Sequence, residues 1–438
     1  MTSNFPPWRR FQSDGAVHAA KEALLNQVPG GNIAAGQDAT GADMTTISET
    51  EVAGAKARAA PRAKTRNLSL DRARTFLTLV VLLHHAVIPY THFGHTDPAE
   101  WIGFDMIVLA NDSFFMAMFF FLSGLFVWPG LGHKAPLTFL RERLLRLGLP
   151  FAVAALTLIP IAYYALALRQ TPDLTFSAFW WKTVTVGPWP SGPIWFVWVL
   201  LAFDLTASLL YRLSPTLVFP INRIAQQSFA EPVRFWLLLV LVTEIAYIPL
   251  LIHYGTNRWF EFGPFSVQAS RVLLYASYFL IGAGVGCANI GSGVISPNGQ
   301  LPRSRWIWLL ATLMPYALMW GMIYIKRQIL DNPPVLPWWY HLCYGTFFVL
   351  FSAAILFTIL AFFLHSKAPG PNLLDRMQGE AYGMFLVHYP IVLWIQYALF
   401  DREWPAIVKA AIAFVLTVIL SWAVTAALRK IPGATRVL

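Results

Sequence analysis

Charged residues are scarce in this 438-residue sequence, where Asp, Glu, Lys and Arg together make up only 12%. Ordinary soluble domains contain roughly a quarter. Hydrophobic residues reach 57%, and they gather in blocks of about twenty residues, the length that crosses a bilayer as a helix. The composition excludes an ordinary soluble domain and predicts an all-α, polytopic membrane protein. We place its ten transmembrane helices near residues 74–92, 104–128, 147–168, 193–211, 235–252, 271–289, 306–325, 341–363, 381–399 and 406–428.

Cysteine is nearly absent. Cys287 and Cys343 lie in separate apolar blocks and form no CxxC pair, so we expect neither a disulfide framework nor a thiolate metal site, and no bound metal. Matched, interrupted helices repeated in the two halves, which are typical of many transporters, are also missing. The glycines of GAGVG (Gly282–Gly286) lie inside an apolar block, where we expect them to pack helices closely rather than to bind phosphate.

Residues 1–67 have no apolar run of signal-peptide length, so we expect no cleaved leader. They are rich in Ala, Gly and Thr and end in a basic stretch, which predicts a disordered cytoplasmic tail. A membrane domain over residues 68–430 and a short cytoplasmic tail over residues 431–438 are expected to follow.

The net charge of +10 has an uneven distribution along the chain. With both termini on the same side, 24 of the 32 Lys and Arg fall on that side of the predicted helices and 8 on the other. The positive-inside rule therefore places both termini in the cytoplasm. Because topology accounts for the basic charge, we expect no nucleic-acid partner.

The first apolar block carries a polar stripe whose members recur every seven residues: Asp71, Thr78, His85 and His92. Arg74 shares this face, since the eleven residues to His85 make about three turns and rise ~16 Å. An arginine at the membrane surface is then aligned with a histidine near the middle of a hydrocarbon layer ~30 Å thick. Ionisable groups at such depth are costly and usually mark a functional path.

His85 has the chemistry of a general base, because a neutral imidazole accepts a proton from a hydroxyl near neutral pH. Pro89 lacks the N–H that would bond the His85 carbonyl, so we expect that carbonyl to be unpaired and the helix to kink. The neighbouring His84 points about 100° away and is expected to pack against another helix. The alternative is a structural His85 that only bonds between helices.

A second candidate site is FLRERLLRLGLP (Phe139–Pro150), where the third membrane block begins. Arg143 and Arg146 share a helix face, and Arg141 lies close by. Arginine forks and helix N-termini suit phosphate groups. Simple positive-inside anchoring explains these arginines equally well.

Two other functions are compatible with these polar residues. A proton-coupled transporter would use His85 together with Glu244 and Asp204, two acids inside apolar blocks, and Glu244 could instead orient His85. A non-catalytic scaffold would use the polar stripe only to hold helices together. Three loops rich in aromatic residues, Arg169–Gly192, His253–Ser270 and Lys326–Tyr340, are expected at the membrane interface, with sugar stacking as the alternative.

These residues together resemble the integral-membrane acyltransferase-3 family. Its members carry an arginine, ten intervening residues and a histidine in the first span, here Arg74 and His85 after Leu70–Asp71, and an Arg-x-x-Arg before the third span, here Arg143 and Arg146. Three further blocks resemble family blocks in the same order: FFFLSGLF (Phe119–Phe126), PIWFVWVLL (Pro193–Leu201) and YGMFLVHYPI (Tyr382–Ile391). The resemblance covers about residues 68–428.

The resemblance implies transfer of an acyl group, acetyl or succinyl, from cytoplasmic acyl-CoA to a hydroxyl of an extracytoplasmic glycan or lipid-linked sugar. His85 would activate that hydroxyl, Arg74 would hold His85 or the donor, and the Arg141–Arg146 segment would contact the CoA phosphates. Acyl-CoA is then a co-substrate rather than a permanently bound cofactor. Stand-alone members of this type imply a multi-pass location in a bacterial inner (plasma) membrane.

Overall fold

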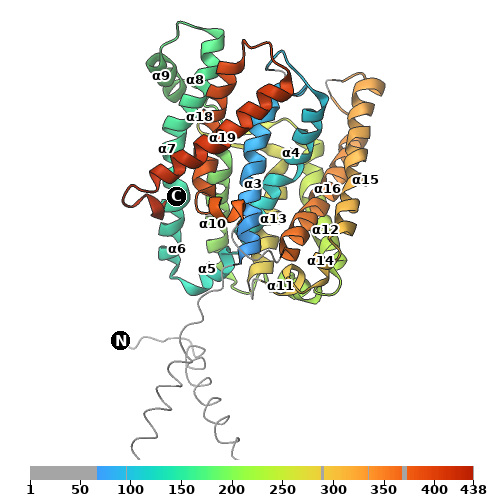
Figure 1. Ribbon diagram of the computed structural model, residues 1–438. Coiled ribbons are helices and arrows are strands. Elements are labelled where there is room, and N and C mark those ends of the chain that lie inside the picture. Colours follow the sequence, from blue (N-terminus) through green and yellow to red (C-terminus); the bar gives the residue numbers. More distant parts are fainter. Residues whose placement is uncertain (1–66, 95, 288–290, 334, 367–371, 438) are drawn as a thin grey trace, which may run out of the picture. The chain divides into compact units, whose positions relative to one another are not determined.

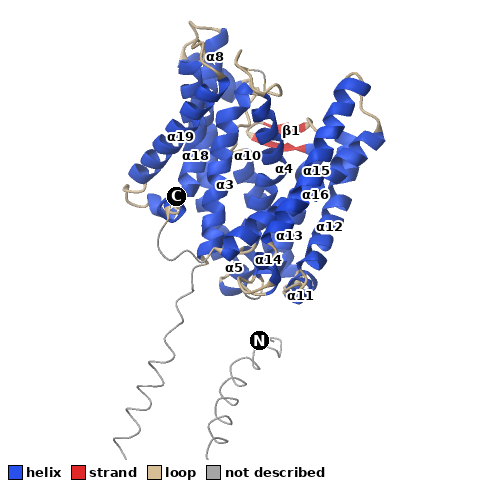
Figure 2. Cartoon of the chain, turned by 45° about the vertical axis from the view of Figure 1, so that its right-hand side comes forward, coloured by secondary structure: helices blue, strands red, loops and turns tan. Residues whose placement is uncertain are grey.

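The computed structural model describes residues 67–437 apart from residues 95, 288–290, 334 and 367–371. Within this part, ten helical segments are long and apolar enough to cross a bilayer, which confirms the predicted all-α, ten-helix class (Figures 1 and 2). The expected tail over residues 1–67 lies outside the described residues except for Asn67.

The membrane segments match the ten predicted blocks. They are built from the following helices: α3 (Leu68–Val87), α4 (Ile102–Gly124) with α5 (Val127–His133), α6 (Pro136–Arg143) with α7 (Leu149–Val153) and α8 (Ile159–Gln170), α10 (Trp195–Leu213), α12 (Pro232–Tyr254), α13 (Val272–Gly286), α15 (Arg305–Tyr324), α16 (Trp338–His365), α18 (Ala381–Leu399) and α19 (Ala406–Leu428). Short helices occupy four connections: α9 (Phe176–Thr185), α11 (Phe219–Gln227), α14 (Gln300–Arg303) and α17 (Leu373–Met377).

A small β-hairpin forms in the loop after α12, where the sequence predicted only an aromatic loop. Strands β1 (Trp259–Phe262) and β2 (Phe265–Gln268) pair antiparallel, with Trp259 opposite Gln268 (Figure 2). Phe262 and Phe265 flank a two-residue turn that contains Gly263 at φ +54°. Because glycine adopts positive φ without a Cβ clash, it permits this tight connection.

Helix α3 lies among other helices, against α4, α16, α18 and α19. Most of its apolar stretch is buried, whereas only 28%, 28% and 22% of the corresponding stretches of α12, α15 and α19 are. Those three helices expose leucine, isoleucine and valine side chains, which is what a surface in contact with lipid requires. The helix with the polar stripe is therefore an interior helix, as a buried functional path requires.

Close packing joins α13 to α4 through the glycines of the GAGVG segment. A Cβ on Gly282 would lie 2.2 Å from the Phe121 carbonyl oxygen, and one on Gly286 would lie 1.9 Å from that of Leu125. Both contacts are sterically forbidden, so only glycine allows this approach. The predicted role of these glycines in helix packing is confirmed.

Prolines in this bundle free backbone carbonyls four residues earlier, and side chains from other segments bond three of them. Gln396 Nε2 donates to His85 O (2.8 Å), Tyr382 Oη to Arg146 O (2.7 Å) and Trp180 Nε1 to Leu156 O (2.8 Å). The prediction that Pro89 leaves the His85 carbonyl unpaired is therefore wrong, because Gln396 on α18 reaches it. The α-helix ends at Val87 and continues as a 3₁₀ turn, Ile88–Tyr90.

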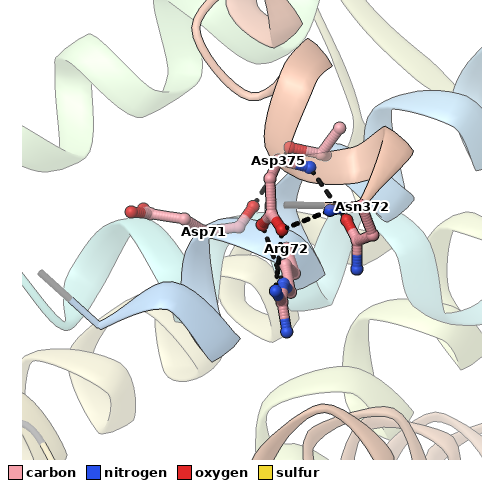
Figure 3. A network of polar contacts seen from close by, with 5 residues as sticks. Asp71, Arg72, Asn372 and Asp375 are labelled. Atoms are coloured by element: carbon pink, nitrogen blue, oxygen red, sulfur yellow. Dashed lines mark hydrogen bonds and ion pairs between the residues drawn. The ribbon is translucent and has the colours of Figure 1, made fainter. Parts of the chain in front are cut away.

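A buried ion pair ties the start of α3 to α17. Arg72 donates from Nε and Nη2 to the two carboxylate oxygens of Asp375, both at 2.7 Å (Figure 3). Asn372 caps α17 by accepting from the Asp375 N–H, while its own N–H bonds the Asp375 carboxylate. This network fixes the helix that carries Arg74 against the segment that precedes α18.

Candidate active site

A cavity of about 630 Å³ lies beside the first half of α3; we call it the arginine cavity. Four arginines line it, Arg74 from α3, Arg143 and Arg146 from the third membrane segment, and Arg429 after α19. Two carboxylates, Asp71 and Asp204, also line it. The predicted arginines of two separate motifs are thus brought to one cavity, with four cations facing two anions.

Arg141 is the exception among the predicted phosphate-binding residues. It lies on the exposed side of α6 and does not line the arginine cavity. The physical reason is helix geometry: residues 143 and 146, three apart, share a face, whereas Arg141 is turned about 200° from Arg143.

Arg74 is held by contacts at the end of α4. Its Nη2 donates to the Leu122 carbonyl (2.8 Å), and its guanidinium lies 4.3 Å from the Phe126 ring centroid. Its Nη1 lies 3.9 Å from the Asp71 carboxylate, one turn earlier on α3. These contacts leave the side chain 35% exposed, so Arg74 is fixed in place while one side of it faces the cavity.

Arg143 and Asp204 form an ion pair across the arginine cavity, with 3.2 Å between Nε and Oδ2. Asp204 is 1% exposed, and neither of its oxygens receives a hydrogen bond from the described residues. The pair is therefore held by charge alone. An incoming phosphate would compete with a poorly bonded carboxylate for Arg143.

A second cavity of about 210 Å³, the histidine cavity, lies further along α3. The residues that line it include two histidines, two tyrosines, two tryptophans, an aspartate and a glutamine: His84, His85, Tyr163, Tyr389, Trp195, Trp259, Asp112 and Gln268. Trp259 and Gln268 come from the β-hairpin. Part of the predicted aromatic loop His253–Ser270 is therefore folded against the histidine predicted as the base.

The His85 ring is surrounded by rings of α18. Its centroid lies 5.2 Å from that of His388 and 5.1 Å from that of Tyr389. Tyr389 Oη in turn donates to Tyr163 Oη at 3.2 Å. No acidic side chain is paired with His85 within the described residues, so its orientation depends on ring packing and on the Gln396 bond to its carbonyl.

His388 supports the His85 ring from behind the cavity wall, and the sequence analysis did not single it out. It is fully buried, its Nδ1 lies 2.6 Å from the Phe385 carbonyl, and its Nε2 has no partner among the described residues. Since a carbonyl only accepts, Nδ1 carries the proton and Nε2 is a free lone pair beside His85. The signal was present: His388 is a histidine inside an apolar block, within the family-like segment Tyr382–Ile391.

His84 packs against Phe115 of α4, with 5.1 Å between ring centroids. The predicted helix contact is confirmed, and the same imidazole also lines the histidine cavity. Across the cavity wall, Asp112 receives a 2.6 Å bond from Arg271, whose side chain is buried. Asp112 itself remains 45% exposed, so its carboxylate is held in place while facing open space.

His92 does not continue the polar stripe, because the helix has ended before it. It lies in the connection to α4, where its Nδ1 is 2.8 Å from Asp105 and its Nε2 is 3.4 Å from Glu100. The hydrogen bond to Asp105 raises the pKa of His92. Its role is to fasten this connection.

The proposed proton relay is not assembled. Asp204 lines the arginine cavity, His85 lines the histidine cavity, and Glu244 lines neither, accepting instead a 3.4 Å bond from Thr346. Within the described ranges, no group of three or more His, Cys, Asp or Glu side chains is arranged to hold a metal ion.

Comparison with known proteins gives one match. A family model described as an acyltransferase domain, that of the acyltransferase-3 family, matches residues 67–426, most of the chain. The comparisons with curated proteins and with solved structures give no match.

Proposed function

Because the chain belongs to the acyltransferase-3 family and is a membrane acyltransferase, we propose that it moves an acyl group from cytoplasmic acyl-CoA to a hydroxyl of an extracytoplasmic carbohydrate. The observation that supports this reaction most is the pair of cavities along α3, one lined by arginines and one by His85. A transfer between two substrates that come from opposite sides of a membrane needs a donor site and an acceptor site that lie next to each other.

The arginine cavity is the proposed donor site. Acyl-CoA carries several phosphates, and arginine pairs with phosphate through two parallel hydrogen bonds. Arg143 and Arg146 are the proposed phosphate contacts, and Arg74, which lines the same cavity from α3, would lie nearer the thioester. The excess of Lys and Arg on the side of the termini supports a cytoplasmic opening for this cavity.

The histidine cavity is the proposed acceptor site. Sugars present apolar faces that stack on indole rings and hydroxyls that bond to carboxylate and amide groups. Trp195 and Trp259 supply the rings, and Asp112 and Gln268 supply the polar groups. Figure 1 shows α9 at the end of the bundle opposite α5 and α6, and Figure 2 shows the hairpin in the half of the bundle away from α5, which supports an extracytoplasmic opening.

In the proposed chemistry, His85 takes the proton of the acceptor hydroxyl while the hydroxyl oxygen attacks the carbonyl carbon of the thioester. The C–S bond then breaks, and the CoA sulfur leaves and takes up a proton, giving an ester and free CoA. General-base help of this kind contributes ~10²–10⁴-fold, and holding both substrates at one point adds the benefit of proximity. No metal or permanent cofactor takes part in these steps.

Glycan analysis tests this function. Carbohydrate from cells with and without the protein is compared by mass spectrometry, and the proposal expects an acyl mass on the glycan or lipid-linked sugar only when the protein is made. Identical glycan masses in the two strains, with the protein present in membranes, would contradict the proposed reaction. The group lost identifies the acyl chain.

A further inference from the structure

Three phenyl rings from three helices line the arginine cavity and lie next to one another. They are Phe119 of α4, Phe196 of α10 and Phe385 of α18, with ring centroids 5.6 Å (119–196), 6.4 Å (119–385) and 5.8 Å (196–385) apart. Phe385 is the only described residue that lines both this cavity and the histidine cavity. Its ring is therefore shared by the two sites.

The same helices line both cavities at successive levels. On α3, Thr78 lines the arginine cavity and Val81 lines the histidine cavity. On α18, Tyr382 lines the arginine cavity, Tyr389 lines the histidine cavity, and Phe385 lies between them in the sequence. The direct route from Arg74 to His85 thus passes the triangle of rings. A group that moves directly from one cavity to the other passes Phe385, the ring that the two linings share.

We infer that Phe385 is a specificity-determining residue that limits the transferred acyl group to a short, uncharged chain. The inference rests on the proposed function, since it assigns the thioester to one cavity and the acceptor to the other. A group that reaches His85 past packed phenyl rings has little room, because overpacking an aromatic contact forces neighbouring side chains from their preferred positions.

Charge restricts the acyl group as well as size. The four arginines among the described lining residues all belong to the arginine cavity; no lysine or arginine lines the histidine cavity, where the acid Asp112 is exposed. A succinyl carboxylate would lose its water between three phenyl rings and would then find Arg271 already paired with Asp112, so that its charge stays uncompensated. An acetyl group meets neither penalty, so the geometry favours acetyl over succinyl.

The passage can be tested by changing the ring. Inside-out membrane vesicles from cells that naturally make the protein enclose its own acceptor and expose the arginine cavity to added donor. Radiolabelled acetyl-, butyryl- and succinyl-CoA are supplied separately, and label in the carbohydrate is measured for wild-type, Phe385→Ala, Phe385→Leu and Phe385→Trp. Phe357→Leu is the matched control for Phe385→Leu, since Phe357 is also a buried phenylalanine but lines neither cavity.

The wild-type protein should transfer acetyl efficiently and succinyl poorly. Phe385→Ala should raise the butyryl-to-acetyl ratio by at least about 10-fold, the size of a one- to two-carbon discrimination in an apolar pocket. Phe385→Leu should shift it in the same direction, Phe385→Trp in the opposite one, and Phe357→Leu should leave it unchanged. Membrane content of each variant is measured alongside.

Two results would overturn the inference: a butyryl-to-acetyl ratio that stays the same in all three Phe385 variants, or succinyl transfer by the wild-type protein as fast as acetyl transfer. A wild-type protein that transfers none of the three donors is a different outcome, because it would overturn the proposed reaction itself.

Discussion

Replacing Arg143 or Arg146 by glutamine should weaken the binding of acyl-CoA. A hydrogen bond to a charged group contributes ~1.5–3 kcal/mol, and each 1.4 kcal/mol is a factor of about ten in Kd. Each substitution is therefore expected to raise Kd by about 10- to 100-fold. The ion pair with Asp204 at 3.2 Å offsets part of the Arg143 charge, so the loss should be larger for Arg146.

Asp204 provides a test in the opposite direction. Asp204→Asn removes a negative charge from the cavity wall and frees Arg143 for a phosphate, so this variant should bind acyl-CoA more tightly than the wild-type protein. In the double variant with Arg143→Gln, the gain should disappear, because it acts through that arginine.

Equilibrium binding of radiolabelled acetyl-CoA to the detergent-purified full chain measures these effects at fixed ionic strength. Arg141→Gln is the matched control: it makes the same charge change on the same helix, but its side chain lies outside the cavity. If Arg141→Gln weakened binding as much as Arg146→Gln, binding would depend on general surface charge. Unchanged Kd values for Arg143→Gln and Arg146→Gln would refute the assignment of the donor site.

Three further predictions follow from individual contacts. Arg72→Ala should lower the free energy of unfolding by ~1.5–3 kcal/mol, because it removes the charged donor from the Asp375 carboxylate and leaves it the bond from the Asn372 N–H; thermal unfolding in detergent measures this. The bond to Arg72 lowers the pKa of Asp375. The stability that this pair contributes is therefore complete above the ordinary aspartate pKa and is lost as pH falls through the lowered pKa. If the stability of the wild-type protein did not depend on pH in this acid range, the pairing would be contradicted. Gln396→Leu should lower the free energy of unfolding by ~1–3 kcal/mol, because the His85 carbonyl loses the hydrogen bond from Gln396. An unchanged melting temperature would argue against that bond. Trp259→Ala should raise the KM for the carbohydrate by about 3- to 10-fold, from a stacking energy of ~0.5–1.5 kcal/mol, and leave the KM for acyl-CoA unchanged; equal rises in both would place Trp259 outside the acceptor site.

Sequence periodicity and composition predicted the membrane helices well, because a bilayer imposes a length and an apolar composition on each helix separately. The face shared by Arg74, Thr78 and His85 was predictable for the same reason: it depends only on the geometry of one helix. The prediction that His92 belongs to the same face was wrong, because periodicity does not show where a helix ends. The α-helix ends at Val87, and the chain from Ile88 to Tyr90, which includes Pro89, forms a 3₁₀ turn.

Contacts between helices were harder to predict. Gln396 lies 311 residues from His85, and Asp375 lies 303 residues from Arg72, so no spacing connects either pair. His388 carried a visible signal, a histidine in an apolar block, yet its position beside His85 depends on how α18 packs on α3. The positions of Arg143 and Arg146 beside Arg74 depend on tertiary packing in the same way, and only the family resemblance had linked those motifs.

The most direct test of the proposed mechanism compares wild-type and His85→Ala proteins in the same inside-out vesicles, with radiolabelled acetyl-CoA as donor. We expect His85→Ala to reach normal membrane levels and to bind acetyl-CoA with the wild-type Kd, because the arginine cavity is intact, while transfer of label to carbohydrate falls to background. Transfer at the wild-type rate by His85→Ala would contradict the central claim that this imidazole activates the acceptor hydroxyl.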